Sequence, residues 1–345
     1  MTPAPPPGPA AVAPPRCVTL GADGVINPGS SQDYRNCRAF LLDTGTRWAR
    51  LWADWPSLQP EADRAPDAGS GAWRVRELDR QIAQANADGV KLILTSYRFP
   101  TWANGALGGV KDPLLKLPPD LTPASPWANW IGFFVKRYGR SIAALEVVNE
   151  PNEQVWPLTG VHKAVAQMFQ TAQAITTANG STPLLLGPAT SDTRQAGIPY
   201  DTFTKNLLDE LDRIGFLPGR NFAWSHHNYT DVEQDEAHGV KTTRELLTNR
   251  WAGWPHADAS DPVILIPEGG ARLSKLATIY RTSETRALQA KLINRNWERM
   301  AKQPGVGMLG QYLFYSDPHF DCGLCDPDGA KRPAFGAWAA LPQGM

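Results

Sequence analysis

The chain has 345 residues, which is enough for two or three domains or for one large α/β barrel. Its 34 Lys and Arg residues balance 34 Asp and Glu residues, and this neutral charge argues against a polyanion-binding protein, because phosphate contacts need clustered cations. With 20% charged and 42% hydrophobic residues the chain can bury a large core, and the absence of any run of 18 apolar residues argues against a membrane span.

The first segment, residues 1–16, consists almost entirely of proline, alanine and glycine. This composition is typical of an extended tail, so we expect the packed structure to be one domain over residues 17–345. The tail has no charged region followed by an apolar run, and is therefore not itself a signal peptide. It resembles the stretch that follows a removed signal, which predicts a secreted protein. A cytoplasmic protein with an irregular start is the alternative.

Eight apolar runs rich in β-branched residues alternate with segments of helical periodicity. The predicted strands are 18–26, 47–53, 91–96, 144–148, 184–188, 222–226, 263–267 and 308–314. The predicted helices are 32–43, 73–88, 127–138, 162–178, 200–214, 242–251 and 284–302. Alternation of this kind indicates parallel strands with helical crossovers. Eight such units predict a closed (β/α)8 TIM barrel of the α/β class, and a doubly wound open sheet is the alternative.

Four cysteines permit two disulfides. Cys17 and Cys37 flank the first apolar run, and a bond between them would fix the start of the domain in an oxidising compartment. Cys322 and Cys325 form a CxxC pair near the end of the chain. We favour a loop disulfide there, with free thiols or a metal or redox pair as alternatives.

No glycine-rich phosphate loop follows a predicted strand, so nucleotide binding has no support from a motif. Zinc would need further ligands at metal spacing, and the sequence offers none, so we predict no metal and no organic cofactor. The functional groups of a (β/α)8 barrel lie where its strands end and the following loops begin. The search for a site therefore narrows to the polar and aromatic residues at these eight positions.

Two glutamates stand at such strand ends. Glu150 follows the fourth predicted strand, and Glu268 follows the seventh. These strands lie across the barrel mouth from each other, so the two carboxylates can converge on a bound ligand. Glycoside hydrolysis needs such a pair, because one carboxylic acid protonates the leaving oxygen while the other carboxylate attacks or directs water. Glu146 has the same strand parity as Glu150, which places it one layer deeper, where a structural ion pair is expected.

Residues 146–152, Glu-Val-Val-Asn-Glu-Pro-Asn, resemble the fourth-strand signature of glycoside hydrolase clan A, the retaining β-glycosidase barrels. The tripeptide Asn-Glu-Pro alone is a weak signal, but its surroundings also resemble the clan. The matching segments follow in order over about residues 17–340 and include 48–52, 91–103, 227–229, 266–269 and 323–335. The resemblance is closest to families 5 and 39.

The resemblance implies roles for the matching positions. Glu150 would be the acid/base and Glu268 the nucleophile. Asn149 would bind the sugar 2-hydroxyl, and Arg50 would pair with Glu268 and keep it ionised.

Other positions would shape the sugar site. Tyr229 would hold and polarise Glu268, with His227 beside it. The remaining substrate-binding candidates are aromatic residues in or near the mouth loops, where sugars stack: Trp52, Trp102 and Trp156. Two departures from the clan stand out. Pro267 precedes the nucleophile where the clan has threonine or serine, so that strand end must be irregular. Tyr315 stands where the clan has a tryptophan under the sugar.

The sequence therefore predicts a retaining glycoside hydrolase that cleaves β-linked oligo- or polysaccharides by double displacement. A catalytically silent carbohydrate-binding barrel, or a transglycosylase using the same carboxylates, is the alternative. The expected partner is a carbohydrate, with no nucleic acid and no membrane, and we expect a monomer. No motif encodes the sugar, the linkage, or endo against exo action.

Overall fold

Eight parallel strands form the centre of the computed structural model, which describes residues 13–27, 30–105, 112–155, 157–180, 183–193, 197–219, 221–250, 263–317 and 320–342. Most of the predicted tail, residues 1–12, lies outside the described residues. The strands are β1 (Arg16–Thr19), β2 (Trp48–Asp54), β3 (Lys91–Tyr97), β4 (Ala144–Glu146), β5 (Leu184–Ser191), β6 (Phe222–His227), β7 (Ile264–Ile266) and β8 (Val306–Tyr312).

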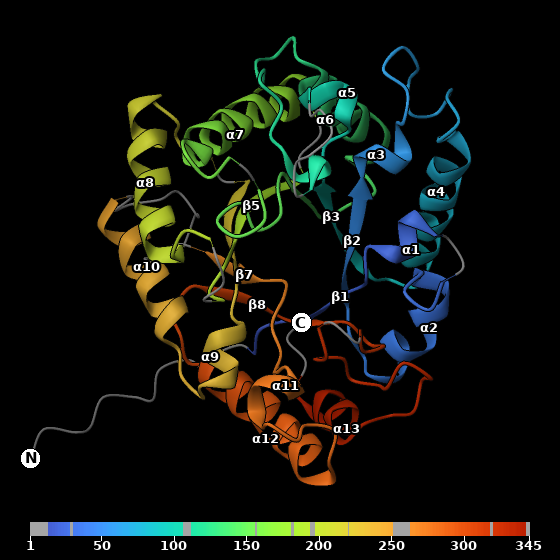
Figure 1. Ribbon diagram of the computed structural model, residues 1–345, viewed down its shortest axis with the longest axis vertical. Coiled ribbons are helices and arrows are strands. Elements are labelled where there is room, and N and C mark those ends of the chain that lie inside the picture. The colour runs from blue at the N-terminus through green and yellow to red at the C-terminus, as the bar shows by residue number, and fades with distance from the viewer. Residues whose placement is uncertain are drawn as a thin grey trace, which may run out of the picture.

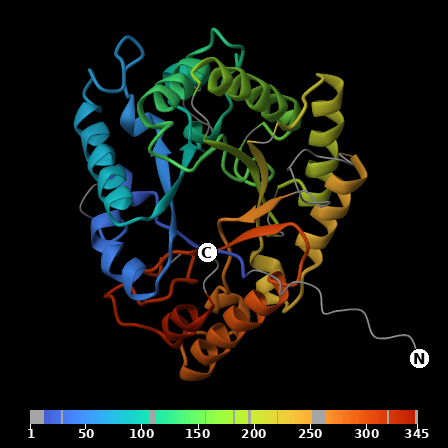
Figure 2. The same cartoon turned by 180° about the vertical axis from the view of Figure 1, so that it is seen from behind.

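The strands close on themselves in chain order. Each strand pairs in parallel with the next, and β1 pairs with both β2 and β8. The helices form a ring around the barrel, as Figure 1 shows and Figure 2 repeats from behind. The predicted (β/α)8 barrel is confirmed, and the open doubly wound sheet is excluded because β1 and β8 are hydrogen-bonded neighbours.

The seven predicted helices are present with small shifts at their ends. They are α2 (Tyr34–Asp43), α4 (Ala72–Ala87), α6 (Pro126–Tyr138), α7 (Val161–Ala178), α8 (Tyr200–Arg213), α10 (His238–Arg250) and α12 (Ser283–Met300). The structure adds short elements in the connections. These are α1 (Asp23–Ile26), α3 (Trp55–Leu58), α5 (Thr101–Asn104), the 3-10 turn η1 (Pro113–Leu115), α9 (Tyr229–Glu233), α11 (Leu273–Leu276) and the closing helix α13 (Pro333–Ala340).

Two boundaries differ from the prediction for identifiable reasons. The first strand ends at Thr19 because α1 begins at Asp23, in a turn that Gly24 allows; a Cβ on Gly24 would lie 2.3 Å from the carbonyl oxygen of Gln32. Helix α10 begins at His238, four residues before the predicted start. The carboxylate of Asp231 accepts hydrogen bonds from the Gly239 and Val240 N–H groups and so caps the extra turn.

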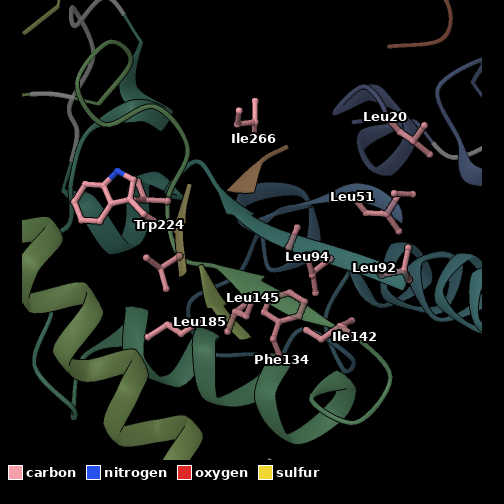
Figure 3. Close-up of a cluster of buried hydrophobic side chains, with 14 of the residues drawn as sticks. Leu20, Leu51, Leu92, Leu94, Phe134, Ile142, Leu145, Leu185, Trp224 and Ile266 are labelled. Carbon is pink, nitrogen blue, oxygen red and sulfur yellow. The ribbon is translucent and has the colours of Figure 1, made fainter. Parts of the chain in front are cut away.

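Alternation along the strands separates two apolar layers. Small and branched side chains fill the lower barrel interior: Cys17, Ile93, Ala144, Leu186, Ala223, Leu265 and Met308. The larger layer lies between the outer face of the barrel and the helices. Figure 3 shows part of it, with Leu51, Leu92, Leu145 and Trp224 on or beside the strands and Phe134 on α6. The outer layer anchors the helices, which leaves the upper barrel interior for polar groups.

All four cysteines are buried free thiols, so neither predicted disulfide is formed. Cys17 points into the barrel interior, whereas Cys37 lies on α2 in the outer layer, and β1 separates the two side chains. In the CxxC pair the Cys322 thiol contacts the carbonyl oxygen of Tyr312 at 3.4 Å, whereas Cys325 packs in the outer layer. Of the alternatives for this pair, free thiols agree with the structure.

In the described part of the chain, no helix is long and apolar enough to cross a bilayer.

Candidate active site

A buried arginine forms the floor of the site. Arg50 points inward from β2 and is 0% exposed. Its Nε donates to Glu146 Oε2 at 2.8 Å, and its Nη2 donates to Asn149 Oδ1 at 2.8 Å. Its Nη1 donates to Glu268 Oε1, which forms a second ion pair. One guanidinium thus joins groups from β2, β4 and the end of β7.

Glu146 belongs to this floor. Besides Arg50, it accepts hydrogen bonds from Thr95 of β3 at 2.9 Å and from Ser225 of β6 at 2.5 Å. Both its oxygens are therefore occupied inside the barrel, one layer below the mouth. This geometry agrees with the structural ion pair expected from its strand parity.

Glu268 follows β7 and is 4% exposed. Its Oε2 accepts a hydrogen bond from the Tyr229 hydroxyl at 2.7 Å, and its Oε1 faces Arg50. Burial raises the pKa of Glu268 above its ordinary value, and the charges of His227 and Arg50 act in the opposite direction without prevailing. The expected pairing with Arg50 is present, but the expected lowering of this pKa is not. Arg50 and Tyr229 fix the direction in which this carboxylate points.

Glu150 lies beyond β4, where the chain turns sharply. Its φ of +40° is unusual for a residue with a side chain, and its N–H bonds to the carbonyl oxygen of Ala189 at 3.2 Å. Its Oε1 accepts from His227 Nδ1 at 2.9 Å, and its Oε2 accepts from Gln154 Nε2. Burial alone would raise the pKa of Glu150, but the hydrogen bond and charge of His227 outweigh it, and the pKa is lowered.

His227, the last residue of β6, connects the two carboxylates. Its Nδ1 lies 2.9 Å from Glu150 Oε1 and 3.5 Å from Glu268 Oε2. Burial acts to lower the pKa of His227, but the charge of Glu268 and the hydrogen bond to Glu150 prevail and raise it. The two carboxylates therefore favour the protonated imidazole that lies between them.

Glu150, His227 and Glu268 each place one ligand atom within 4.8 Å of the others, which is close enough to hold a metal ion. Hydrogen bonds and ion pairs of these three residues also explain why they lie so close together. His227 Nδ1 already donates to Glu150, and the Arg50 cation pairs with Glu268. A cation at this point would have to displace one of them, so a hydrogen-bonded carboxylate pair fits these residues better than a metal centre.

A cavity of about 140 Å³ opens above the two glutamates. This volume suits a group of the size of one sugar ring. Polar atoms of Asn149, Glu150 and Glu268 line its base, and aromatic rings form most of its wall. The lining residues are Ala22, Trp52, Tyr97, Asn149, Glu150, Gln154, Tyr229, Glu268, Tyr312 and Phe320.

Trp52 is the predicted stacking residue that lines this cavity. It is 4% exposed, its Nε1 donates to the carbonyl oxygen of Leu20, and the Arg50 guanidinium lies 4.3 Å from its ring centre. The centroids of the Trp52 and Tyr97 rings lie 4.6 Å apart. These contacts hold the indole firmly beside the two glutamates.

Two other predicted aromatic residues, Trp102 and Tyr315, are placed differently. Trp102 packs edge-on against Trp55 at 5.5 Å and donates to the carbonyl oxygen of Gln59 at 3.2 Å, away from the cavity lining. Tyr315 packs against Phe40 at 5.4 Å in the outer layer. Trp156 lies outside the described residues.

Five lining residues were absent from the predicted site: Ala22 and four with larger side chains. Tyr312 ends β8 and faces the cavity, because its parity is that of the inward residue Met308. Tyr97 ends β3 and has the parity of Ile93 in the same way. Strand parity could have found both tyrosines. Phe320 and Gln154 lie on loops, where no periodic signal marks them, so sequence reasoning had no means of finding them.

A second cavity, of about 380 Å³, lies beside the site in the loops that follow β4, β5 and β6. Its wall includes Glu153, Asp192 and Asp231. Burial raises the pKa of Asp192 well above its ordinary value and that of Asp231 to about 6. Asp192 nevertheless accepts from the N–H groups of Thr230 and Asp231, so these acids also brace the loops.

Comparison with solved structures gives the same barrel. A family 39 glycoside hydrolase from Bacteroides cellulosilyticus WH2 superposes with a TM-score of 0.62 at 15% identity, over 94% of this chain and 63% of that one. A GH5_18 protein from Streptomyces cattleya, solved with GlcNAc, gives 0.62 at 14% identity, over 97% and 83%. A family 5 xyloglucan-specific endo-β-1,4-glucanase from a metagenomic library, solved with cellotriose, gives 0.59 at 14% identity, over 95% and 96%.

The chain thus has the fold of the two families that its motifs resemble, and spans less than two thirds of the family 39 protein. No family model matches the sequence, and no curated protein matches it.

Proposed function

We propose that this chain is a retaining β-glycosidase that acts on an oligo- or polysaccharide by double displacement. The observation that carries the proposal is the separation of the two carboxylates. One oxygen of Glu150 and one of Glu268 lie within 4.8 Å of each other. Retaining enzymes hold their carboxyl groups about 5–5.5 Å apart, whereas inverting enzymes leave about 6.5–9.5 Å for a water molecule.

In the first step Glu268 is the nucleophile. Arg50 and Tyr229 hold its carboxylate, and both donate to the ionised form, so attack on the anomeric carbon needs no reorientation. Glu150 donates a proton to the leaving oxygen. The products of this step are a glycosyl ester on Glu268 and a free leaving group.

The proton for this step belongs to the pair of Glu150 and His227. In the free protein the pKa of Glu150 is lowered and that of His227 is raised, so the proton resides mainly on the imidazole. The state with protonated Glu150 and neutral His227 holds the same number of protons. The pair can thus supply the acid form without taking a proton from solvent.

In the second step Glu150 is the base. It accepts a proton from water as the water attacks the glycosyl ester, and Glu268 leaves as the carboxylate. Asn149, which lines the cavity beside both glutamates, is the group that would bind the sugar 2-hydroxyl. The residues named suffice for the reaction, and the proposal includes no metal and no organic cofactor. We also propose that the protein is secreted and monomeric.

The test compares the wild-type protein with Glu268→Gln and Glu150→Gln on β-linked polysaccharides and aryl β-glycosides. Glu298→Gln, an exposed amide substitution on α12, is the matched control. We expect Glu268→Gln to lose nearly all activity. Glu150→Gln should retain its first step with good aryl leaving groups, which need no acid, and azide should restore its turnover by attacking the glycosyl enzyme.

A Glu268→Gln variant as active as wild type would exclude Glu268 as the nucleophile. Binding of a sugar without cleavage by any variant would indicate a silent binding barrel. Transfer to an added sugar in preference to water would indicate a transglycosylase. The anomeric configuration of the first product, read by NMR, separates retention from inversion.

A further inference from the structure

The side chain of Gln154 reaches the catalytic carboxylates, although no motif marks it. Residues 150–154 form a tight turn in which the Glu153 and Gln154 N–H groups bond to the Glu150 carbonyl oxygen at 3.0 and 2.9 Å. This turn brings the Gln154 side chain back over Glu150, as helical spacing does for residues four apart. Gln154 lines the 140 Å³ cavity and is only partly buried, so its amide can move.

Both ends of this amide are engaged by groups assigned to catalysis. Gln154 Nε2 donates to Glu150 Oε2, and Gln154 Oε1 accepts from Asn149 Nδ2 at 3.3 Å. His227 already occupies Glu150 Oε1, and Arg50 occupies Asn149 Oδ1. The two atoms that Gln154 covers are thus the ones left for a leaving oxygen and for a sugar hydroxyl.

The Gln154 amide also influences the protonation state of Glu150. An amide N–H can only donate, so its bond is stronger to a carboxylate than to a neutral carboxylic acid. While Gln154 is in place, Glu150 favours its ionised form. When a sugar displaces the amide, this preference is lost, and Glu150 takes up a proton more readily.

We propose that Gln154 is a positioning residue that holds Glu150 ionised in the free enzyme and yields Glu150 Oε2 and Asn149 Nδ2 to the bound sugar. This inference rests on the proposed function. In this scheme substrate binding itself promotes protonation of Glu150, because the incoming sugar removes the hydrogen bond that opposes it.

The first test is the pH dependence of kcat/KM in Gln154→Met, which keeps the length of the side chain and removes the donor. Loss of the donor increases the proton affinity of Glu150, so the alkaline limb should move upward. The shift is at most about one pH unit, a tenfold change, because the proton of the pair resides mainly on His227 and only the form with protonated Glu150 gains. Gln173→Met on α7, a partly buried glutamine that does not line the cavity, is the matched control and should not move it. The melting temperature of both variants should remain that of wild type.

An unmoved alkaline limb in Gln154→Met, with activity reduced equally at every pH, would mean a structural role only and would overturn the proposal. An equal shift in Gln173→Met would overturn it as well, since the effect would not belong to this site.

A second readout needs no turnover. The NMR signals of the His227 imidazole report which partner of the Glu150–His227 pair holds the proton. In Gln154→Met the proton should move toward Glu150, so the imidazolium share of His227 near pH 6 should fall. An unchanged titration would overturn the inference. A shifted titration together with a fully active Glu268→Gln would instead reject the proposed function and leave the role of Gln154 in setting this ionisation intact.

Discussion

The Glu150–His227 contact makes stability depend on pH in a defined window. The pKa of His227 is raised above its ordinary 6.5, so its contribution to stability is complete below 6.5 and is lost as pH rises through the folded value. The pKa of Glu150 is lowered from 4.5, so its contribution is present above 4.5 and is lost as pH falls through the folded value. Both contributions coincide between these two ordinary values.

We therefore expect the free energy of unfolding of wild type to exceed that of His227→Gln most between pH 4.5 and 6.5, and the difference to shrink at alkaline pH. Urea unfolding at a series of pH values measures it. His162→Gln, on α7 outside the site, should show no such profile. A difference that stays constant from pH 4 to 9 would contradict the ion pair as its source.

At the scale of residues, sequence reasoning worked best where strand ends fix positions. Glu150, Glu268 and His227 meet because each lies at or shortly beyond the carboxyl end of a strand. Arg50 reaches Glu268 and Asn149 from the inward face of β2. The prediction for β8 extended to residue 314, whereas the strand ends at Tyr312. That error moved the expected aromatic residue from Tyr312 to Tyr315, which packs outside the barrel.

Among the elements, β7 and β8 show how the structure accommodates Pro267, which stands where the clan has threonine or serine. Pro267 follows the three-residue β7, and the register of the β7–β8 pair shifts after Ile264. The Pro267 carbonyl accepts a hydrogen bond from the Thr19 hydroxyl at 2.9 Å. On β8, Gly310 leaves room for this backbone, since a Cβ there would lie 2.1 Å from the Pro267 oxygen. Because Gly310 has no side chain, the backbone before Glu268 can pack closely against β8.

We predict that Gly310→Ala destabilises the protein by about 1–3 kcal/mol, because the added methyl group must push the Pro267 backbone away. It should also lower kcat, since that backbone carries Glu268. Gly336→Ala in α13 is the control: no atom lies within 4 Å of its Cβ position, and alanine favours a helix. Denaturant unfolding and activity measure both effects. A Gly310→Ala variant as stable as Gly336→Ala would show that the strands tolerate the methyl group.

The long elements could be predicted because each has a strong signal, a helical period in α7 and a continuous apolar run in β3. The short helices α3, α5 and α9 lie in the loops that follow β2, β3 and β6 and contain four or five residues. No periodicity can be recognised over so few residues, so tertiary contacts determine them.

For the whole molecule, the four free thiols mean that noncovalent packing alone holds the barrel closed. Each cysteine is 0% exposed, and burial raises the pKa of the Cys17 thiol and that of Cys325, the latter to about 11. Since the thiolate is the reactive form, we expect no thiol of the native protein to react with an aromatic disulfide reagent at pH 8. All four should react after denaturation.

A reducing agent should accordingly leave the melting temperature unchanged. A fall in melting temperature on reduction, or fewer than four reactive thiols in the denatured chain, would reveal a disulfide. Cys17→Ala and Cys37→Ala provide separate controls for the two layers, because one thiol lies inside the barrel and the other outside it.

At this scale the alternation of strands and helices was sufficient to predict a closed barrel. The pairing of cysteines was not predictable, because spacing along the chain does not say on which side of a strand a thiol lies. Cys17 and Cys37 are 20 positions apart in sequence, yet β1 stands between their side chains.

The Arg50 floor also has a consequence for the order in which the chain is synthesised. Arg50 meets Glu146 after 96 residues, but it meets Glu268 only after 218. Because a chain leaves the ribosome N-terminus first, the cation and its first anion are made long before the second. Arrival of β7 then brings Glu268, the second carboxylate, to the arginine. Under the proposed function, a nascent chain that stops short of β7 has Glu150 but lacks the proposed nucleophile, so activity would begin only when the ring is nearly complete.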